Sequence, residues 1–394
     1  MALLVNSAYN FVDTIFVGQG MGPIGIGAVS VVMRALGAGE KARALSAAGN
    51  ALSSAVVIGF IVGILGITFV SSLVRLLGAS GELVQPTYEY ARIIVLSEPN
   101  YLIRGEGRAR VAMVVITSSI LLNIALDPLF IFGFGWGLGG AALATLFGHI
   151  LTTVLSAAYF VRGQGAVRIT LASLRPRLDL LWETLVIGFS GLMRQRSSGI
   201  VQIVRNNLIV ALAGPLAVSA FGVVFRMILI MALPAMGIAQ ALPPIAGYNF
   251  GAGNPQRVRQ SVWLSMGFSS LITWIGMGVM MLFPALIFRI FTSDPEVISI
   301  GIPFMRVNAI AVLVFPAYFI GAAFYQAIGA PRRALVIALL RPAVGLVIMF
   351  AAVQTVGTIG VVAADPLAIA VGALLVMALL MHSFRTDKRL AVCA

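Results

Sequence analysis

Long apolar runs, separated by short polar or glycine-rich breaks, follow one another along the whole chain. A helix needs about 20 predominantly apolar residues to cross the hydrocarbon core of a bilayer. No stretch shows the alternating pattern, about ten residues long, of a transmembrane β-strand. The pattern therefore predicts an all-α polytopic membrane protein. The predicted spans are residues 2–18, 22–36, 45–77, 84–103, 110–132, 137–161, 183–213, 215–243, 258–290, 297–328, 333–355 and 358–384.

Composition and charge agree with this class of protein. Of the 394 residues, 60% are hydrophobic and 10% are charged, and the net charge is +13. The basic residues gather in alternate loops, among them the linker at 162–179 and the tail after residue 384. Because cytoplasmic loops are rich in Lys and Arg, we expect this linker and the C-terminus in the cytoplasm, with the protein in the cell (inner) membrane. The net charge then needs no nucleic-acid partner.

The two halves of the chain resemble each other in sequence. GPIGIGAVSVVMR at 22–34 is similar to GPLAVSAFGVVFR at 214–226, an offset of 192. WGLGGAALAT at 136–145 is similar to VGTIGVVAAD at 356–365, an offset of 220. The repeat predicts two six-helix bundles related by a parallel pseudo-two-fold axis, with a transport pathway between them.

Changes in this offset locate differences between the halves. The offset rises from 192 to 214 and then to 222, so the first half lacks about 22 residues in its second span and about 8 in its fourth. The chain also begins inside its first span, so we expect the first, second and fourth helices of the N-lobe to be shortened. The expected domains are an N-lobe at 1–165, a basic cytoplasmic linker at 166–182 and a C-lobe at 183–394.

Polar residues recur at one depth within the first-half spans. Asn123 and Asp127 lie four residues apart and share one face of a helix. Counted at 1.5 Å per residue, Asp13, Asp127 and Thr145 lie roughly 8–12 Å below the outer surface. A carboxylate at membrane depth is costly and usually functional, which predicts a cation or proton site. A second interpretation stays open, in which Asp127 only caps a backbone group freed by Pro128.

The chemistry of this predicted site allows two occupants. Two carboxylates, an amide and a hydroxyl offer hard oxygen ligands that suit Na⁺. Two desolvated carboxylates that lie close together can instead share and release a proton. The residue types do not choose between Na⁺ and H⁺.

Five segments, taken together, are specific enough to indicate a family. They are YNFVDTIFVGQGMGP (9–23), RALGAGEKARA (34–44), LIRGEGRARVAM (102–113), LLNIALDPLFIFGFGWGLGGAALAT (121–145) and LPAMGIAQALPPIAGYNFGAGNPQRV (233–258). With these segments the chain resembles the MATE (multidrug and toxic compound extrusion) family. Within that family it is similar to the bacterial and archaeal, DinF-like branch with paired N-lobe aspartates.

The resemblance implies a twelve-helix antiporter of two six-helix lobes that works by alternating access. Such a protein exports amphipathic, often cationic compounds in exchange for Na⁺ or H⁺ and needs no cofactor beyond that ion. The family's cation site falls on Asp13, Asn123, Asp127 and Thr145, and Tyr90 is the best match for a tyrosine expected nearby. The expected partners are small molecules and the lipid bilayer, and we expect a monomer. No nucleophile–base constellation indicates an enzyme.

Two residues of the second half are further candidates for the substrate cavity. By the offset of 192, Arg205 corresponds to Asp13, and we hypothesise that it faces the cavity and holds Asp13 ionised. The alternative is a charge that is satisfied inside the C-lobe. Met231 is a candidate for an adaptable drug-facing wall, although methionine at such a position is more often ordinary packing.

Two other functions stay open at the level of the sequence. A flippase for lipid-linked precursors, from the same broader superfamily, would need several cationic residues in its cavity, and Arg194, Arg196 and Arg205 could supply them. A truncated, inactive membrane remnant is the second alternative, because the shortened helices belong to the lobe that carries the predicted cation site.

Overall fold

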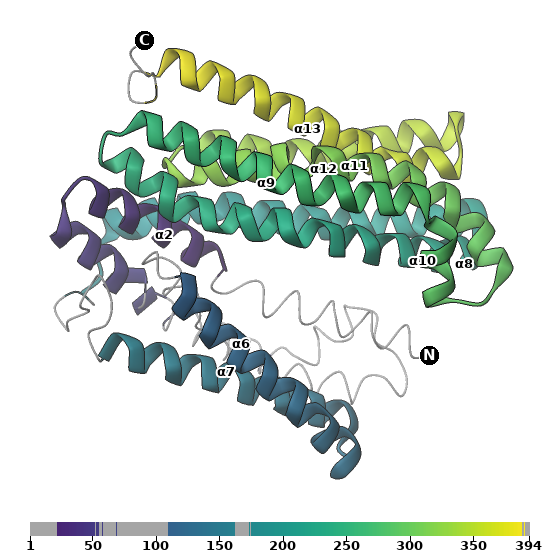
Figure 1. The fold of residues 1–394 in the computed structure, drawn as a ribbon, viewed down its shortest axis with the longest axis horizontal. Helices are drawn as coiled ribbons and strands as arrows, with labels where there is room; N and C mark the ends of the chain where they lie inside the picture. The colour runs from purple at the N-terminus through teal and green to yellow at the C-terminus, as the bar shows by residue number, and fades with distance from the viewer. Residues whose placement is uncertain are drawn as a thin grey trace. The chain divides into compact units, whose positions relative to one another are not determined.

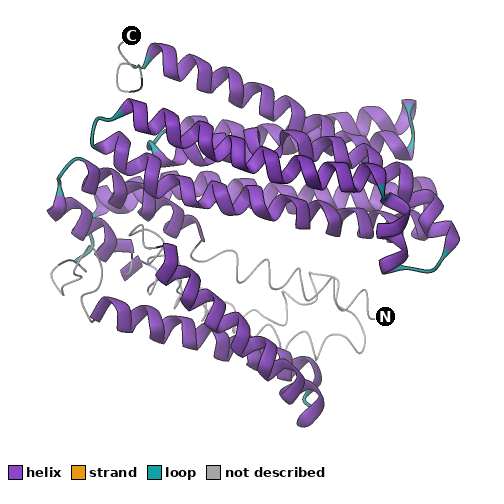
Figure 2. Ribbon diagram, viewed as in Figure 1, coloured by secondary structure: helices purple, strands orange, loops and turns teal. Residues whose placement is uncertain are grey.

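Helices make up almost all of the chain that the computed structural model describes (Figures 1 and 2). The described residues are 22–51, 53–54, 57, 68, 109–161, 173, 175–387 and 390, and no strand occurs among them. The chain divides into two compact units, Met1–Gly188 and Phe189–Ala394.

The helices of each unit follow the order of the apolar runs. In the first unit they are α2 (Gly22–Gly37), α6 (Ala109–Pro128), the π-helical turn η2 (Leu129–Gly133) and α7 (Gly137–Val161). Helix α8 (Leu178–Gly251) begins in the first unit and continues into the second. The remaining helices are α9 (Pro255–Leu282), α10 (Pro284–Phe291), α11 (Pro295–Ala327), α12 (Pro331–Thr355) and α13 (Thr358–Thr386).

Seven helices in the described part of the chain are long and apolar enough to cross a membrane. Helix α8 holds two of the predicted spans, because Gly214 breaks it with a φ of 78° and a ψ of −179°. Left-handed φ values cost little only for glycine, which explains why the break falls at this residue. The predicted all-α membrane fold is therefore confirmed, and the 16 residues of α2 agree with a shortened second span. The predicted first and fourth spans lie outside the described residues.

One predicted span is divided in the structure. The run 258–290 was expected to form a single helix, but α9 ends at Leu282 and α10 begins at Pro284. Proline has no backbone N–H and its ring clashes with the preceding turn, so it favours the first position of a helix, which Pro284 takes in α10. The hydrophobic pattern runs through this break because both segments are apolar.

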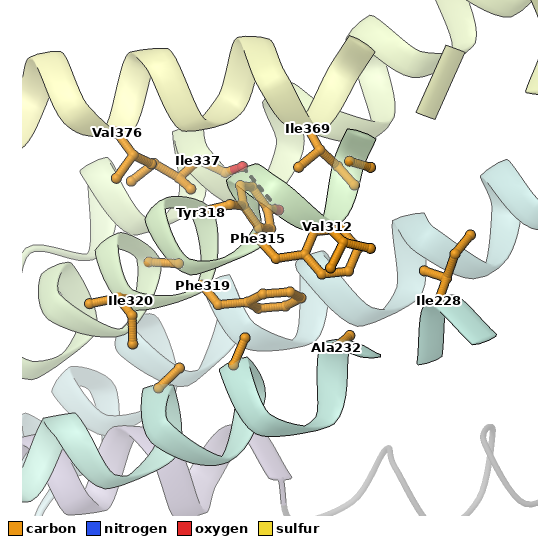
Figure 3. Packing of buried hydrophobic residues seen from close by; sticks show 14 of the residues in the cluster. Ile228, Ala232, Val312, Phe315, Tyr318, Phe319, Ile320, Ile337, Ile369 and Val376 are labelled. Carbon is orange, nitrogen blue, oxygen red and sulfur yellow. Dashed lines mark hydrogen bonds between the residues drawn. The ribbon is translucent and has the colours of Figure 1, made fainter. Parts of the chain in front are cut away.

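In the second unit, α11 packs against α9, α12 and α13. Its aromatic residues Phe315, Tyr318 and Phe319 are buried, and the Tyr318 hydroxyl donates to the Ile337 carbonyl at 3.5 Å (Figure 3). Close approach of α13 depends on Gly321, because a Cβ there would overlap the Val376 side chain. Small residues at such contacts let helices approach closely, and this packing is a main source of helix association in membranes.

In the first unit, the N-terminal part of α8 contacts α2 and the helical residues 41–51. The Glu183 carboxylate accepts from Arg34 Nη2 at 2.8 Å and from Arg43 Nη2 at 3.0 Å. Gly27 of α2 lies so close to the Thr184 backbone that a Cβ would overlap it. The segment that follows the linker is therefore a fixed part of the first unit.

Replacement of Gly321 tests the close packing of α11 and α13. We expect Gly321→Leu to destabilise the protein by about 1–3 kcal/mol, because the new side chain must displace Val376. Gly267→Leu is the matched control, since an added Cβ at this exposed position meets nothing within 4 Å. Thermal unfolding of both variants in detergent measures the difference, and equal melting temperatures would contradict the packing.

Candidate functional site

Helix α6 carries Asn123 and Asp127 one turn apart, near its C-terminal end. Pro128 ends the α-helical hydrogen-bonding pattern, and the chain continues as the wider turn η2. Gly135 and Gly137 then adopt φ values of 70° and 54°, which reverse the chain into α7. Only glycine adopts such conformations at little cost, so the glycine-rich sequence of this turn is required by its shape.

Two glycines of α7, one on either side of Thr145, bring the helix against η2 and α6. A Cβ on Gly140 would lie 2.8 Å from the Phe130 carbonyl carbon, and a Cβ on Gly148 would lie 2.9 Å from Ser119 Oγ. In the gap between these contacts, the Asn123 side-chain amide donates to Thr145 Oγ1 at 3.3 Å. The Thr145 hydroxyl in turn donates to the Ala141 carbonyl at 3.0 Å. The structure thus joins two of the four residues of the predicted cation site.

The Asp127 carboxylate lies one turn from this pair and is half-buried. Its Oδ1 is buried and accepts no hydrogen bond from the residues that the structure describes. In the alternative interpretation, this carboxylate accepts a hydrogen bond from a backbone group that Pro128 frees. Oδ1 accepts no such bond from the described backbone. A buried carboxylate oxygen without a partner is costly, and a bound cation or a proton would remove that cost.

The other two first-half candidates, Asp13 and Tyr90, lie outside the described residues. Among the described residues, no group of three or more His, Cys, Asp or Glu side chains has the arrangement of a metal centre.

In the second unit, Arg205 is buried and has an acidic partner that the sequence analysis did not identify. Arg205 Nη1 forms an ion pair with Asp365 Oδ2 at 3.2 Å. Arg341 donates to the same carboxylate, from Nε to Oδ1 at 3.1 Å and from Nη2 to Oδ2 at 3.0 Å. The repeat held a signal for this cluster, because the offset of 220 aligns Asp365 with Thr145.

Met231 lies among packed side chains of the second unit. It is half-buried against the hydrophobic core, and its sulfur fits against Gly276 of α9, where a Cβ would overlap it. This contact is ordinary helix packing through a small residue.

The helices, their repeated order and the polar groups at membrane depth define a polytopic α-helical membrane protein. Within this class, the chain belongs to the MatE family, whose model matches residues 4–129 and 200–353.

Individual relatives and structures agree with the family assignment. The chain is 26% identical over 355 residues to the multidrug export protein MepA of Staphylococcus aureus, covering 87% of this chain and 78% of that protein. Its fold is similar to the outward-facing conformation of a multidrug resistance MATE family transporter of the MOP superfamily, with a TM-score of 0.85 and 26% identity over 98% of this chain and 94% of that chain. A MATE structure in complex with MaD5 gives a TM-score of 0.87 and 26% identity over 98% and 89% of the two chains.

A double-mutant cycle tests the hydrogen bond between Asn123 and Thr145. We expect Asn123→Ala and Thr145→Val to couple by about 0.6 kcal/mol, with an upper bound near 1.7 kcal/mol, as other hydrogen bonds between membrane helices do. Unfolding of the wild type, both single variants and the double variant in mixed micelles gives the coupling energy. Strictly additive effects would show that the two side chains do not interact.

Proposed function

We propose that this protein is a secondary active transporter that exports amphipathic compounds by antiport with Na⁺ or H⁺. The observation that carries the proposal is the unpartnered Asp127 Oδ1 beside the Asn123–Thr145 hydrogen bond, in helices of membrane-spanning length. Multidrug export by the MepA relative supports the substrate class.

In this proposal the coupling ion binds at Asp13, Asn123, Asp127 and Thr145, with Tyr90 nearby, as in the branch with paired N-lobe aspartates. Binding gives the free oxygen of Asp127 a partner and removes a buried negative charge from the membrane interior. The ion can drive export only if its binding favours one conformation of the transporter over the other. The unpartnered Asp127 oxygen favours ion binding, and in this proposal that binding is tighter in one conformation than in the other. No cofactor other than this ion takes part.

The orientation follows from the distribution of basic residues. We place the protein in the cell (inner) membrane as a monomer, with the basic linker at 162–179 and the C-terminus in the cytoplasm. The ion pairs of Glu183 with Arg34 and with Arg43 then lie at the cytoplasmic surface, where water solvates charged side chains.

Replacement of Asp127 tests the proposed coupling. In proteoliposomes with an imposed Na⁺ or H⁺ gradient, we expect Asp127→Asn to lower the export of the cationic dye dansylcadaverine by about tenfold or more. The neutral amide keeps the size of the side chain and removes the charge that binds the ion.

Asp179→Asn is the matched control, because Asp179 is exposed and pairs only locally with Arg177 at 3.0 Å. We expect this variant to transport as the wild type does, and the gradient that drives the wild type identifies the ion. Export by Asp127→Asn at the wild-type rate under both gradients would refute the proposed site.

A further inference from the structure

The second unit carries a large excess of positive charge at membrane depth. Six arginines of this unit lie about two helical turns or more from the ends of their helices: Arg194, Arg196, Arg205, Arg226, Arg306 and Arg341. Between residues 189 and 386 the sequence holds three acidic residues, of which Asp294 and Glu296 cap and begin α11 and only Asp365 lies at membrane depth. Within the part of the chain that the structure describes, neither Arg226 nor Arg306 forms an ion pair.

The Arg205–Asp365–Arg341 cluster concentrates this excess in one place. One carboxylate faces two guanidinium groups, which leaves the cluster with a net positive charge. Arg205 also donates to the Gln202 side chain, and its guanidinium lies 4.6 Å from the centre of the Phe221 ring. Its Nε is buried and has no hydrogen-bond acceptor among the described residues. The internal contacts therefore do not neutralise the cluster.

Arg341 is the accessible member of the cluster. The exposed fractions of the Arg205, Asp365 and Arg341 side chains are 3%, 9% and 20%. Arg341 uses Nε and Nη2 to bind Asp365, and its guanidinium also interacts with the Tyr318 hydroxyl. A ligand would therefore meet Arg341 first, beside the Tyr318 ring, whose centre lies 5.9 Å from the guanidinium carbon.

A further guanidinium, that of Arg194, lies near Arg341 and forms no ion pair with a described carboxylate. Arg194 is half-buried, and its guanidinium carbon is 5.7 Å from the centre of the Phe319 ring, the residue after Tyr318. Its Nε is buried and has no acceptor in the described part of the protein. Arg194 and Arg341 are close enough to repel each other. Arg194 and the net positive charge of the cluster, beside two aromatic rings, favour a ligand with an anionic group and an apolar body.

From this geometry we propose that the Arg205–Asp365–Arg341 cluster binds an anion, and that the transported compounds include amphipathic molecules with a carboxylate or phosphate group. The proposal rests on the transport function proposed above and names a substrate class for it. An unneutralised charge in a low-dielectric interior is costly, and an anion on Arg341 removes that cost. The planar guanidinium fork matches carboxylate and phosphate groups in shape as well as in charge.

The repeat gives this assignment a second basis. The offsets of 192 and 220 align Arg205 with Asp13 and Asp365 with Thr145. Where the first half places a carboxylate for a cation, the second half places a guanidinium. In sequence, the aligned positions thus carry opposite charges, which suits a driving cation in one half and an anionic substrate group in the other.

Binding of two dyes that share one fluorophore tests the proposal. Dansylglycine carries a carboxylate and dansylcadaverine an ammonium group. Their affinities are measured by fluorescence for the full chain in phosphatidylcholine nanodiscs, without an ion gradient. We expect Arg341→Gln, which makes the cluster neutral, to weaken dansylglycine binding by about tenfold or more. We expect Asp365→Asn, which raises the positive charge, to strengthen it severalfold, and dansylcadaverine binding to change in neither variant.

The expected changes in dansylglycine affinity have opposite signs in Arg341→Gln and Asp365→Asn, and this difference distinguishes a binding role of the cluster from a structural one. If the cluster only holds helices together, both variants weaken binding of both dyes alike, and that result would overturn the proposal, as would unchanged affinities in both. Arg289→Gln, at an exposed arginine in the last turn of α10, is the control for loss of one positive charge and should leave both affinities unchanged. If either variant fails to fold, the sign of the effect in the other variant decides.

A second set of nanodiscs identifies the source of the anion. These nanodiscs contain phosphatidylglycerol, and the ratio of the dansylglycine affinities of wild type and Arg341→Gln is measured again. A smaller ratio supports a lipid headgroup as the anion at the cluster. An unchanged ratio supports a soluble amphiphile. Because these measurements need no transport, they stand apart from the proposed coupling. If the wild type shows no gradient-driven dansylcadaverine export but binds dansylglycine as expected, the proposed coupling alone is refuted.

Discussion

The shared carboxylate of Asp365 is the constraint on which the second half of the structure depends. In a hydrocarbon environment polar groups must find partners within the protein, so two arginines and one aspartate can be buried only if their helices keep one register. Asp365 on α13 binds Arg341 on α12 through two hydrogen bonds and Arg205 on α8 through an ion pair. Sliding any of these helices by one turn would break at least one of these contacts and leave a buried charge alone.

Close packing of helices supports this register and was only partly predictable. The ends of α7, α12 and α13 lie within about two residues of the predicted spans, because hydrophobic length alone determines where a helix leaves the membrane. The break between α9 and α10 was missed, since the residues on both sides of Pro284 are apolar and the hydrophobic pattern does not change there. The glycine contacts at Gly321 and Gly148 depend on the partner helix, which periodicity does not identify.

The candidate site shows the same division. The spacing of Asn123 and Asp127, and the depth of Thr145, predicted that α6 and α7 would present polar groups to each other, because these are local properties of a helix. The partner of Arg205 was not predicted, since Asp365 lies 160 residues away in sequence and reaches it only through folding. The repeat was the one long-range signal in the sequence. It aligned Asp365 with Thr145. Because one residue is an aspartate and the other a threonine, the alignment did not indicate that both positions carry polar groups of a buried cluster.

The two halves therefore carry the same helical frame with different chemistry at corresponding positions. In the first half an amide and a hydroxyl are hydrogen-bonded to each other, and a carboxylate oxygen beside them lacks a partner. In the second half a carboxylate is fully engaged, and the surplus is positive. An unpartnered negative group gains free energy from a cation, whereas a surplus of guanidinium groups gains it from an anion. A repeated fold can in this way separate the ion that supplies the driving force from the charged group of the substrate. Each half then needs residues that complement the charge of one ligand only. The cation and the anionic group do not compete for the same residues.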